Sequence, residues 1–408
     1  MRRDVRIAVV AATASCLVTI TGAALLWPDA SDSPVVVSYG GPSTEAPNLR
    51  PLPSPSSPTA EAGGLPEPSA SASAETEETE DPVPDCVDDC KPADAPLLRD
   101  AAPAGEGPLP DASPVTCPEP THRVADAEQL QAALDQAAPG DTIELSDGEY
   151  GGQFVTSASG TSEQPVFLCG SEAAVLDGGD VEDGYVLHLD GAQYWRLVGF
   201  SVTNGQKGVM ADRTVGTVVQ GLTVHGIGDE AIHLRDNSTD NVVLDNTIRD
   251  TGIRRDDYGE GVYIGTAVSN WCTYTNCQPD RSDRNVIKGN DIAEVTSEAI
   301  DLKEGTTGGA VLGNTFDGSR VTGADSWVDV KGNNYLIEGN TGTTAPEDGF
   351  QTHQILDGWG DFNVFRANDG VVHGPGNGIS SWPPGANVVT CDNTVSGAGE
   401  GLSNIDCT

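Results

Sequence analysis

The strongest constraint on the fold is a repeat in the second half of this 408-residue chain. Asparagine followed by threonine or aspartate recurs, at Asn246, Asn290, Asn314, Asn340, Asn368 and Asn393. The last four intervals are 24, 26, 28 and 25 residues, and the first is longer because a loop is inserted at about 265–284. One unit of this length cannot bury its apolar face alone, so successive units must stack into a solenoid.

Each unit holds two or three short β-branched segments separated by Gly, Asn and Asp, as at 231–235 and 241–244. These segments are too short for helices and alternate with a period of two, which indicates strands. We therefore expect an all-β fold, a right-handed parallel β-helix solenoid over residues 116–408. The recurrent asparagine predicts a ladder of side-chain amides at one turn of each coil.

A helix is expected just before the first coil. Leu130, Ala133 and Leu134 lie on one face of a helix over residues 126–137. This N-terminal helix would cap the solenoid at an end where an open strand edge would invite aggregation. The first coil is expected at 139–150.

Two segments precede this domain. Residues 1–27 have a basic start and no charge from Ile7 to Trp27, which indicates a signal peptide or an N-terminal membrane anchor. Residues 28–115 hold 18 of the 27 prolines and few aromatics, which is typical of a disordered linker. We expect the protein to be secreted or anchored at the outer face of the cell membrane, with the linker as a tether.

The domain is strongly acidic. Of 62 acidic and 21 basic residues, 44 and 15 follow Val115, so the domain carries −29 of the net charge of −41. A surface this acidic excludes general binding of nucleic acid, and it repels polyanions except at a local basic site.

The cysteines predict disulfides rather than a metal site. Eight cysteines besides Cys16 are an even number in an exported chain. The pairs we expect are Cys86–Cys90, Cys117–Cys169, Cys272–Cys277 and Cys391–Cys407. The histidines are not placed to complete a zinc site.

Alternation in the predicted strands places two columns of side chains on the outer surface. Within 231–235, Ile232 and Leu234 point inward, whereas His233 and Arg235 point outward. The same register gives a first column of His188, Met210, His233, Tyr263, Asp301, Asp329, Gln351 and Ser380. It gives a second column of Asp190, Asp212, Arg235, Gly265, Lys303, Lys331, His353 and Trp382.

The second column contains a basic strip of Arg235, Lys303, Lys331 and His353 on an otherwise acidic body. We interpret these four residues as candidate catalytic groups. The alternative is a surface ion-pair ladder, in which they only neutralise the neighbouring Asp301 and Asp329.

Carboxylates gather beside this strip. Glu298, Asp301 and Asp329 are the candidate ligands for Ca²⁺, which prefers several carboxylate and carbonyl oxygens, and Glu260 and Glu304 also fall nearby. Substrate contacts are expected from residues on or beside the columns, namely His233, Arg254, Tyr263, Gln351, Trp359 and Trp382. The two tryptophans would stack on sugar rings, with buried packing as the alternative for Trp359.

Residues 130–150, followed by Ser159-Gly-Thr and Pro165-Val, resemble the opening of the β-helix polysaccharide lyases of the chondroitinase B and alginate lyase family. Residues 120–408 are similar to the pectin-lyase-like superfamily as a whole. Residues 298–306, followed by Gly313-Asn-Thr-Phe316, resemble the family segment that carries the catalytic lysine. The resemblance implies that Lys303 is the base.

The chain departs from the family at the catalytic acid. The family has an arginine there, in an Arg-His-Gly-Asn motif one coil later, whereas this chain has Val330-Lys-Gly-Asn333. The acid would then be Lys331, Arg235 or His353.

The sequence favours a lyase that cleaves a uronate-containing polysaccharide by β-elimination. A cation neutralises the uronate carboxylate, a base removes the C5 proton and an acid protonates the leaving oxygen. The partner would be an acidic glycan, bound by a monomer.

Three alternatives stay open. A glycoside hydrolase could use Asp301 and Asp329, although the paired-aspartate and Gly-His-Gly motifs of β-helix polygalacturonases are absent. A C5-epimerase would share the proton abstraction. A non-catalytic module for glycan binding or surface adhesion would suit a tethered chain.

Overall fold

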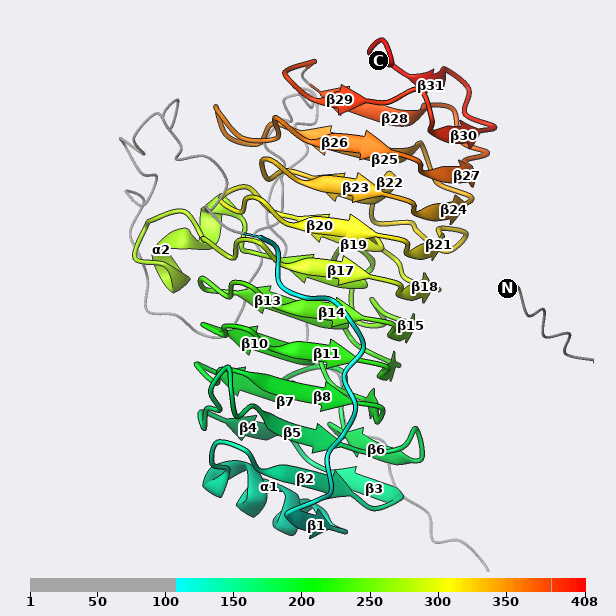
Figure 1. The fold of residues 1–408 in the computed structure, drawn as a ribbon. Helices are drawn as coiled ribbons and strands as arrows, with labels where there is room; N and C mark the ends of the chain where they lie inside the picture. Colours follow the sequence, from blue (N-terminus) through cyan, green and yellow to red (C-terminus); the bar gives the residue numbers. More distant parts are fainter. Residues whose placement is uncertain (1–107, 383) are drawn as a thin grey trace, which may run out of the picture. The chain divides into compact units, whose positions relative to one another are not determined.

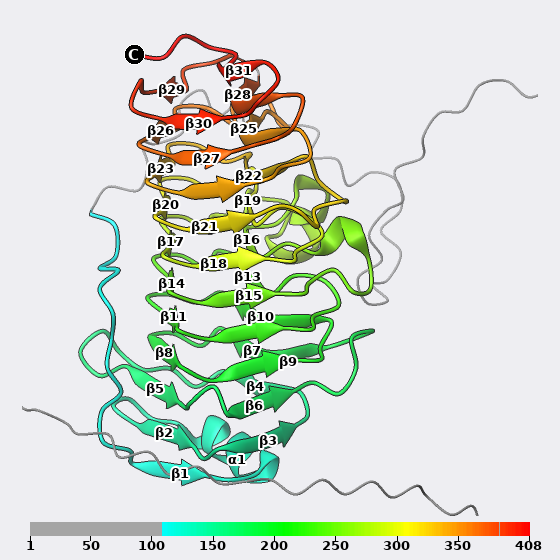
Figure 2. The same ribbon diagram turned by 90° about the vertical axis from the view of Figure 1, so that its right-hand side faces the viewer.

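The computed structural model describes residues 108–408 except 383. The predicted anchor at 1–27, most of the predicted linker at 28–115 and the Cys86–Cys90 pair lie outside the described residues. Residues 116–408 form the predicted right-handed parallel β-helix, in which successive coils stack along one axis (Figures 1 and 2).

Three parallel sheets run along the solenoid and are called sheets A, B and C. Sheet A has eleven strands: β1 (His122–Val124), β2 (Thr142–Leu145), β5 (Val166–Cys169), β8 (Trp195–Val198), β11 (Val218–Gln220), β14 (Val242–Leu244), β17 (Val286–Lys288), β20 (Ala310–Leu312), β23 (Leu336–Glu338), β26 (Val364–Arg366) and β29 (Val388–Val389). Sheet B has ten: β3 (Gly148–Gly151), β6 (Ala174–Asp177), β9 (Ser201–Thr203), β12 (Thr223–His225), β15 (Thr247–Arg249), β18 (Asp291–Ala293), β21 (Thr315–Asp317), β24 (Thr341–Thr343), β27 (Asp369–Val371) and β30 (Thr394–Ser396). Sheet C has ten: β4 (Phe154–Thr156), β7 (Tyr185–Asp190), β10 (Lys207–Asp212), β13 (Ile232–Arg235), β16 (Val262–Ile264), β19 (Ile300–Leu302), β22 (Ser326–Val330), β25 (Asp348–His353), β28 (Asn377–Trp382) and β31 (Gly401–Ser403).

The core is a stack of inward-pointing aliphatic side chains. Ile232, Val262, Ile300 and Val328 are aligned by strand pairing along sheet C, and each is fully buried. Because one side chain from each coil rests on the next, the core grows coil by coil, as expected for a solenoid.

The asparagine ladder is confirmed. The Asn314 side-chain oxygen accepts from both the backbone N–H and the side-chain amide of Asn290, each at 2.9 Å. The same pair of bonds repeats along the stack from Asn246 to Asn393. The ladder therefore satisfies buried amides at one turn of successive coils.

The helices are short. α1 (Ala127–Gln136) lies at the N-terminal end of the stack, where Leu130 and Leu134 join the core and the Asp126 carboxylate accepts from the backbone N–H of Gln129 (Figure 1). The predicted loop insertion at 265–284 forms η2 (Val268–Asn270) and α2 (Trp271–Tyr274), and η1 (Asp256–Tyr258) precedes β16. Within the described part of the chain, no helix has the length and apolar character needed to cross a membrane.

Residues 108–115, assigned to the linker from sequence, instead pack on sheet A, and we call them the strap. Ala112 and Val115 cover an outward-facing apolar stripe that includes Val218, Val242 and Val286. The backbone N–H and C=O of Val115 bond the Gln220 side chain at 2.7 and 3.0 Å. Composition alone misses this contact because the strap, with three prolines in eight residues, continues the proline-rich composition of the linker.

Three of the predicted disulfides are present, Cys117–Cys169, Cys272–Cys277 and Cys391–Cys407. Cys117–Cys169 joins the segment after the strap to β5. Cys272–Cys277 closes the inserted loop, and Cys391–Cys407 holds the C-terminal segment against the last coil.

Candidate active site

Both predicted columns lie on the outer face of sheet C. Strand pairing aligns the whole first column, from His188 to Ser380. In the second column it aligns Asp190 to Arg235 at one end and His353 with Trp382 at the other. Asp301 and Asp329 are direct neighbours on β19 and β22, and Lys303 and Lys331 follow these strands. The predicted register is confirmed, so the basic strip and the acidic residues share one face.

A third set of charged side chains precedes the strands of sheet C. Glu230, Glu260 and Glu298 are linked from coil to coil, because the residue after each glutamate donates its N–H to the next glutamate's carbonyl. Ala231 and Ile232 both point into the core, so the chain bends there and simple alternation fails. The sequence does carry a signal, a glutamate followed by a small residue and a β-branched one at 230–232, 260–262 and 298–300.

The two lysines converge on the two aspartates. Lys331 Nζ lies 2.8 Å from Asp301 Oδ1 and 2.9 Å from Asp329 Oδ2. Lys303 Nζ lies 2.7 Å from Asp301 Oδ2, and His353 Nδ1 lies 2.8 Å from Asp329 Oδ2. The ion-pair ladder considered from sequence is thus present, and it is largely buried rather than on the open surface.

These contacts set the charge states. Burial alone would lower the pKa of Lys303, but Asp301 and Glu304 hold it well above its usual range. Burial likewise lowers the pKa of Lys331, and Asp301 and Asp329 raise it further than burial lowers it. Burial raises the pKa of Asp329, but Lys331 and His353 lower it to about 2. The substrate-free cluster therefore holds both lysines charged, and Asp329 as a carboxylate.

Tyr263 is the aromatic neighbour of this cluster. It is paired with Asp301 in the strand register, and Lys303 Nζ lies 4.9 Å from the centre of its ring. On the other side its ring meets the His233 ring edge-on at 4.3 Å. Tyr263 thus brings a phenol to Lys303, which is the most exposed cation among the two lysines and Arg235.

Three of the carboxylates suit a divalent cation. Glu260, Glu298 and Asp301 each offer an oxygen, and these oxygens lie within 4.8 Å of one another. Glu260 Oε2 is buried without a hydrogen-bond partner among the described residues. Burial, and then Glu230 and Glu298, raise the pKa of Glu260 well above its ordinary value. Glu260 takes the place expected for Asp329 in this set of oxygens. Asp301 is also paired with Lys303 and Lys331, so a cation bound there would compete with both amines.

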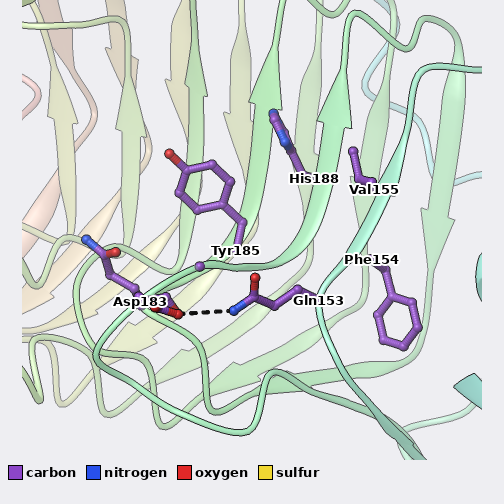
Figure 3. A pocket seen from close by; sticks show the side chains of 8 residues that line it. Gln153, Phe154, Val155, Asp183, Tyr185 and His188 are labelled. Carbon is purple, nitrogen blue, oxygen red and sulfur yellow. Dashed lines mark hydrogen bonds between the residues drawn. The ribbon is translucent and has the colours of Figure 1, made fainter. Parts of the chain in front are cut away.

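A cavity of about 410 Å³ opens on the same face near the N-terminal end of sheet C (Figure 3). It lies beside His188 and Tyr185 of β7, four strands before β19 in sheet C. No sequence signal pointed to it, because several lining residues come from the connections before β4 and β7.

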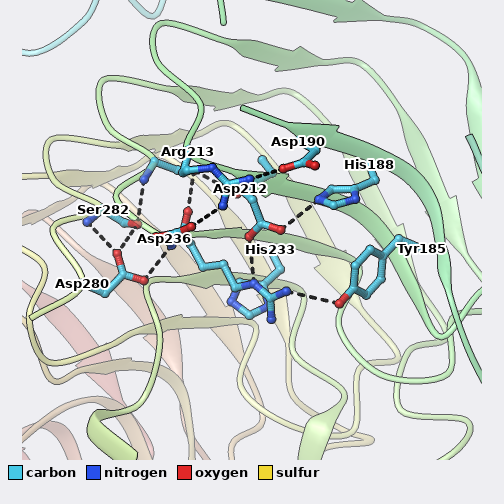
Figure 4. Close-up of polar contacts among 12 residues, drawn as sticks. Tyr185, His188, Asp190, Asp212, Arg213, His233, Asp236, Asp280 and Ser282 are labelled. Atoms are coloured by element: carbon cyan, nitrogen blue, oxygen red, sulfur yellow. Dashed lines mark hydrogen bonds and ion pairs between the residues drawn. The ribbon is translucent and has the colours of Figure 1, made fainter. Parts of the chain in front are cut away.

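A separate network around Asp212, His188 and Tyr185 (Figure 4) includes Arg235. Its Nε donates to Asp212 Oδ1 at 2.8 Å, and Asp212 also contacts His188 Nε2 at 2.8 Å. The guanidinium lies 3.9 Å from the centre of the Tyr274 ring of the inserted loop. Gly265 separates Arg235 from Lys303 in the second column, so the structure does not bring Arg235 to the lysine cluster.

The remaining candidates divide by exposure. Trp382 is 63% exposed beside His353. Trp359 is only 4% exposed, because its Gly-rich loop folds back on the solenoid, so the stacking role expected for it does not fit. Gln351 is buried against Asp325, and the guanidinium of Arg254 is held by Asp229.

No family model matches this chain, but the chain is similar to several known proteins. The solved structure of an alginate lyase from Paenibacillus sp. str. FPU-7 has a TM-score of 0.65 and 33% identity, covering 70% of this chain and 98% of that chain. Pectate lyase PEL9 of Emericella nidulans is 28% identical over 137 residues, 29% of this chain and about a third (33%) of that relative's length. The structure of pectate lyase Pel9A has 14% identity and a TM-score of 0.46, over 65% of this chain and 72% of that one.

Proposed function

Because this chain belongs to the family of β-helix polysaccharide lyases that includes the Paenibacillus alginate lyase, we propose that it cleaves a uronate-containing glycan by β-elimination at the Lys303 cluster. The observation that carries the proposal is the contact of Lys303 with Asp301 and the Tyr263 ring, in the middle of sheet C. Alginate is the first substrate to test, since the match to the Paenibacillus alginate lyase covers 98% of that enzyme.

The reaction needs two groups that exchange protons with the sugar. Lys303 is the residue that the family resemblance assigns to the C5 proton. Its amine contacts the Asp301 carboxylate and the ring of Tyr263. A base role for Lys303 requires that its ion pair with Asp301 be broken when the glycan binds, because this pair holds the amine charged. We add Tyr263 to Lys331, Arg235 and His353 as a candidate acid, because its ring centre lies 4.9 Å from Lys303 Nζ.

Lys331 and His353 have a supporting role in this scheme. Lys331 bridges Asp301 and Asp329, and His353 contacts Asp329. They fix the two aspartates, and Asp301 in turn fixes the amine of Lys303. Trp382 lies beyond His353 on the same face, where its exposed ring would contact sugars away from the cleaved bond.

The carboxylates of Glu260, Glu298 and Asp301 fit a divalent cation such as Ca²⁺ and would be its ligands. When bound, the cation would supply positive charge for the uronate carboxylate. The fit rests on the unpartnered Glu260 Oε2 in an all-oxygen set. We expect Ca²⁺ to raise the melting temperature and a chelator to lower it, and Glu260→Gln to abolish that difference.

The test of the function uses two variants of one residue. We expect wild-type protein to release unsaturated uronate ends from alginate, measured by their ultraviolet absorbance. Lys303→Ala should lower kcat about 10²- to 10⁴-fold, the usual contribution of a proton-transfer group. Lys303→Arg keeps the charge but cannot act as a base.

An inactive Lys303→Arg would support proton transfer, and an active one would reduce Lys303 to charge neutralisation. Wild-type protein that releases no unsaturated ends from any polyuronate would overturn the lyase assignment. The matched control is Lys288→Ala, which removes a lysine on sheet A that bonds the strap carbonyl of Ala112.

We also propose that the enzyme acts outside the cell. Three disulfides within the described residues suit an oxidising compartment. Fractionation of the producing cells, with a thiol-trapping assay on the recovered protein, would test this location.

A further inference from the structure

The cavity beside β7 lies on the path that a glycan would follow along sheet C. His188, on its wall, begins the first outward column, and Asp301 is four strands further along the same column. Strands stack about 4.8 Å apart, so the cavity is about 19 Å from the lysine cluster. A bound oligosaccharide that reacts at Lys303 would reach the cavity only if it extends by several sugars.

The lining of the cavity suits the hydroxyl groups of a sugar but offers no lysine or arginine to pair with a uronate carboxylate. Gln153 supplies an amide, Asp183 a carboxylate and Tyr185 an aromatic ring (Figure 3). Gln206 also lines the cavity, and its amide donates to Asp229 at 3.0 Å. The lining includes neither lysine nor arginine. Amides and a carboxylate bind hydroxyl groups, whereas Asp183 disfavours the carboxylate of a uronate.

The Gln153 amide is available for a ligand. Its bonds to Asp183 are long, 3.5 Å to the backbone oxygen and 3.4 Å to Oδ1. Gly184 makes room for it, since a Cβ at that position would lie 1.8 Å from the amide nitrogen. The backbone at Gly184 has a φ of +76°, which also favours glycine.

The opposite wall is held rigidly. Tyr185 Oη accepts from Arg235 at 3.2 Å, and the ring of Tyr185 packs edge-on against His188 at 5.1 Å. Asp212 joins His188 to Arg235, and Tyr274 covers Arg235. The wall is therefore pre-organised, which lowers the entropy cost of binding.

We propose that this cavity is a distal subsite that binds the hydroxyl face of one pyranose ring and anchors long glycan chains, an inference that rests on the proposed lyase function. The carboxylate of that sugar would point away from Asp183. The enzyme would consequently prefer long chains over short oligosaccharides.

The experiment compares long and short substrates in variants of Gln153. We expect Gln153→Ala to raise KM for polymeric alginate about 2- to 10-fold, the effect of losing uncharged hydrogen bonds, with kcat unchanged. KM for a trisaccharide should not change, because a chain that short does not span from Lys303 to the cavity. Gln153→Glu, which preserves the shape, should raise KM for the polymer at least as much.

The control is Gln136→Ala, an exposed glutamine of α1 outside the cavity, which should leave both KM values unchanged. Equal effects of Gln153→Ala on long and short substrates, or no effect on either, would overturn the subsite. Titration of Lys303→Ala protein with oligosaccharides of defined length separates the two proposals. If the wild type does not cleave but long chains bind more tightly than short ones in a Gln153-dependent manner, the lyase function fails and the subsite stands.

Discussion

The asparagine turn and the outer face of sheet C are both stacks of one residue per coil, but they differ in what repeats. The turn repeats the same side chain from Asn246 to Asn393, and each amide satisfies the next. The first column of sheet C changes at every coil, from His233 to Tyr263, Asp301 and Asp329. A repeated side chain can be explained by packing alone, whereas buried charges of changing type need partners and invite a functional explanation.

Substitutions in the buried pair of Lys207 and Glu230 test whether the charged side chains of sheet C also stabilise the fold. Their charged atoms lie 2.9 Å apart, and each side chain is 2% exposed. Lys207→Met should lower the free energy of unfolding by about 3–5 kcal/mol, because it removes the lysine from Glu230 and leaves this buried carboxylate with the longer contact to His233, at 3.5 Å. Denaturant unfolding of this variant and of a Lys207→Met, Glu230→Leu double variant would measure it. If the double variant were as unstable as the single one, the loss of stability would not come from the buried carboxylate of Glu230.

The turn should show a slightly smaller effect on stability and none on chemistry. Asn314→Ala removes the acceptor of two Asn290 donors and the amide that donates to the Ile287 carbonyl. We expect a loss of about 2–4 kcal/mol in unfolding free energy. Activity per folded molecule should stay at the wild-type value. Thr315→Ala, at the neighbouring exposed position, is the control and should be nearly neutral.

The pH dependence of stability should separate the two regions as well. Burial would raise the pKa of Asp212, but His188 and Arg235 lower it below its ordinary value, whereas the amides of the turn do not titrate. A lowered folded-state pKa means that stability from this group is full above its ordinary pKa of 3.8 and is lost as the pH falls. Each unit by which the folded state lowers this pKa contributes about 1.4 kcal/mol to the free energy of unfolding. Melting curves at falling pH should therefore drop less steeply in Asp212→Asn than in the wild type.

The smallest effect is expected at an exposed pair. Arg366 and Glu338 on sheet A lie 2.8 Å apart with side chains 47% and 35% exposed. Arg366→Ala should leave the unfolding free energy nearly unchanged, since solvent screens such pairs. A larger change in denaturant unfolding would show that exposed ion pairs on other faces contribute as the buried network does.

The sequence was sufficient for the parts of the molecule that follow strict periodicity. The repeat and the period-two alternation predicted the solenoid, the amide ladder and the register that joins Asp301 to Asp329. It was insufficient where the chain bends, because Ala231 and Ile232 both turn inward and bring Glu230 onto the outer face. Trp359 was ambiguous for a related reason, since the path of a Gly-rich loop is set by contacts distant in sequence.

Side-chain pairing was the other limit. Because the family's arginine is missing from its motif, the sequence left Lys331, Arg235 or His353, which share one column, as the candidate acid. Only the structure shows that Arg235 is covered by Tyr274 and that Tyr263 contacts Lys303. Column membership follows from strand register, but the choice of partner depends on side-chain reach across neighbouring coils.

The strap gives the molecule a defined response to mechanical load. Residues 108–115 run along sheet A past β17 and β11, and Cys117 is bonded to Cys169 on β5 (Figure 1). A force applied at residue 108 first breaks the non-covalent contacts of the strap with sheet A. It is then borne by the disulfide from Cys117 to Cys169 on β5. The force therefore enters the solenoid at β5, and α1, β1 and the first coil lie outside the loaded path.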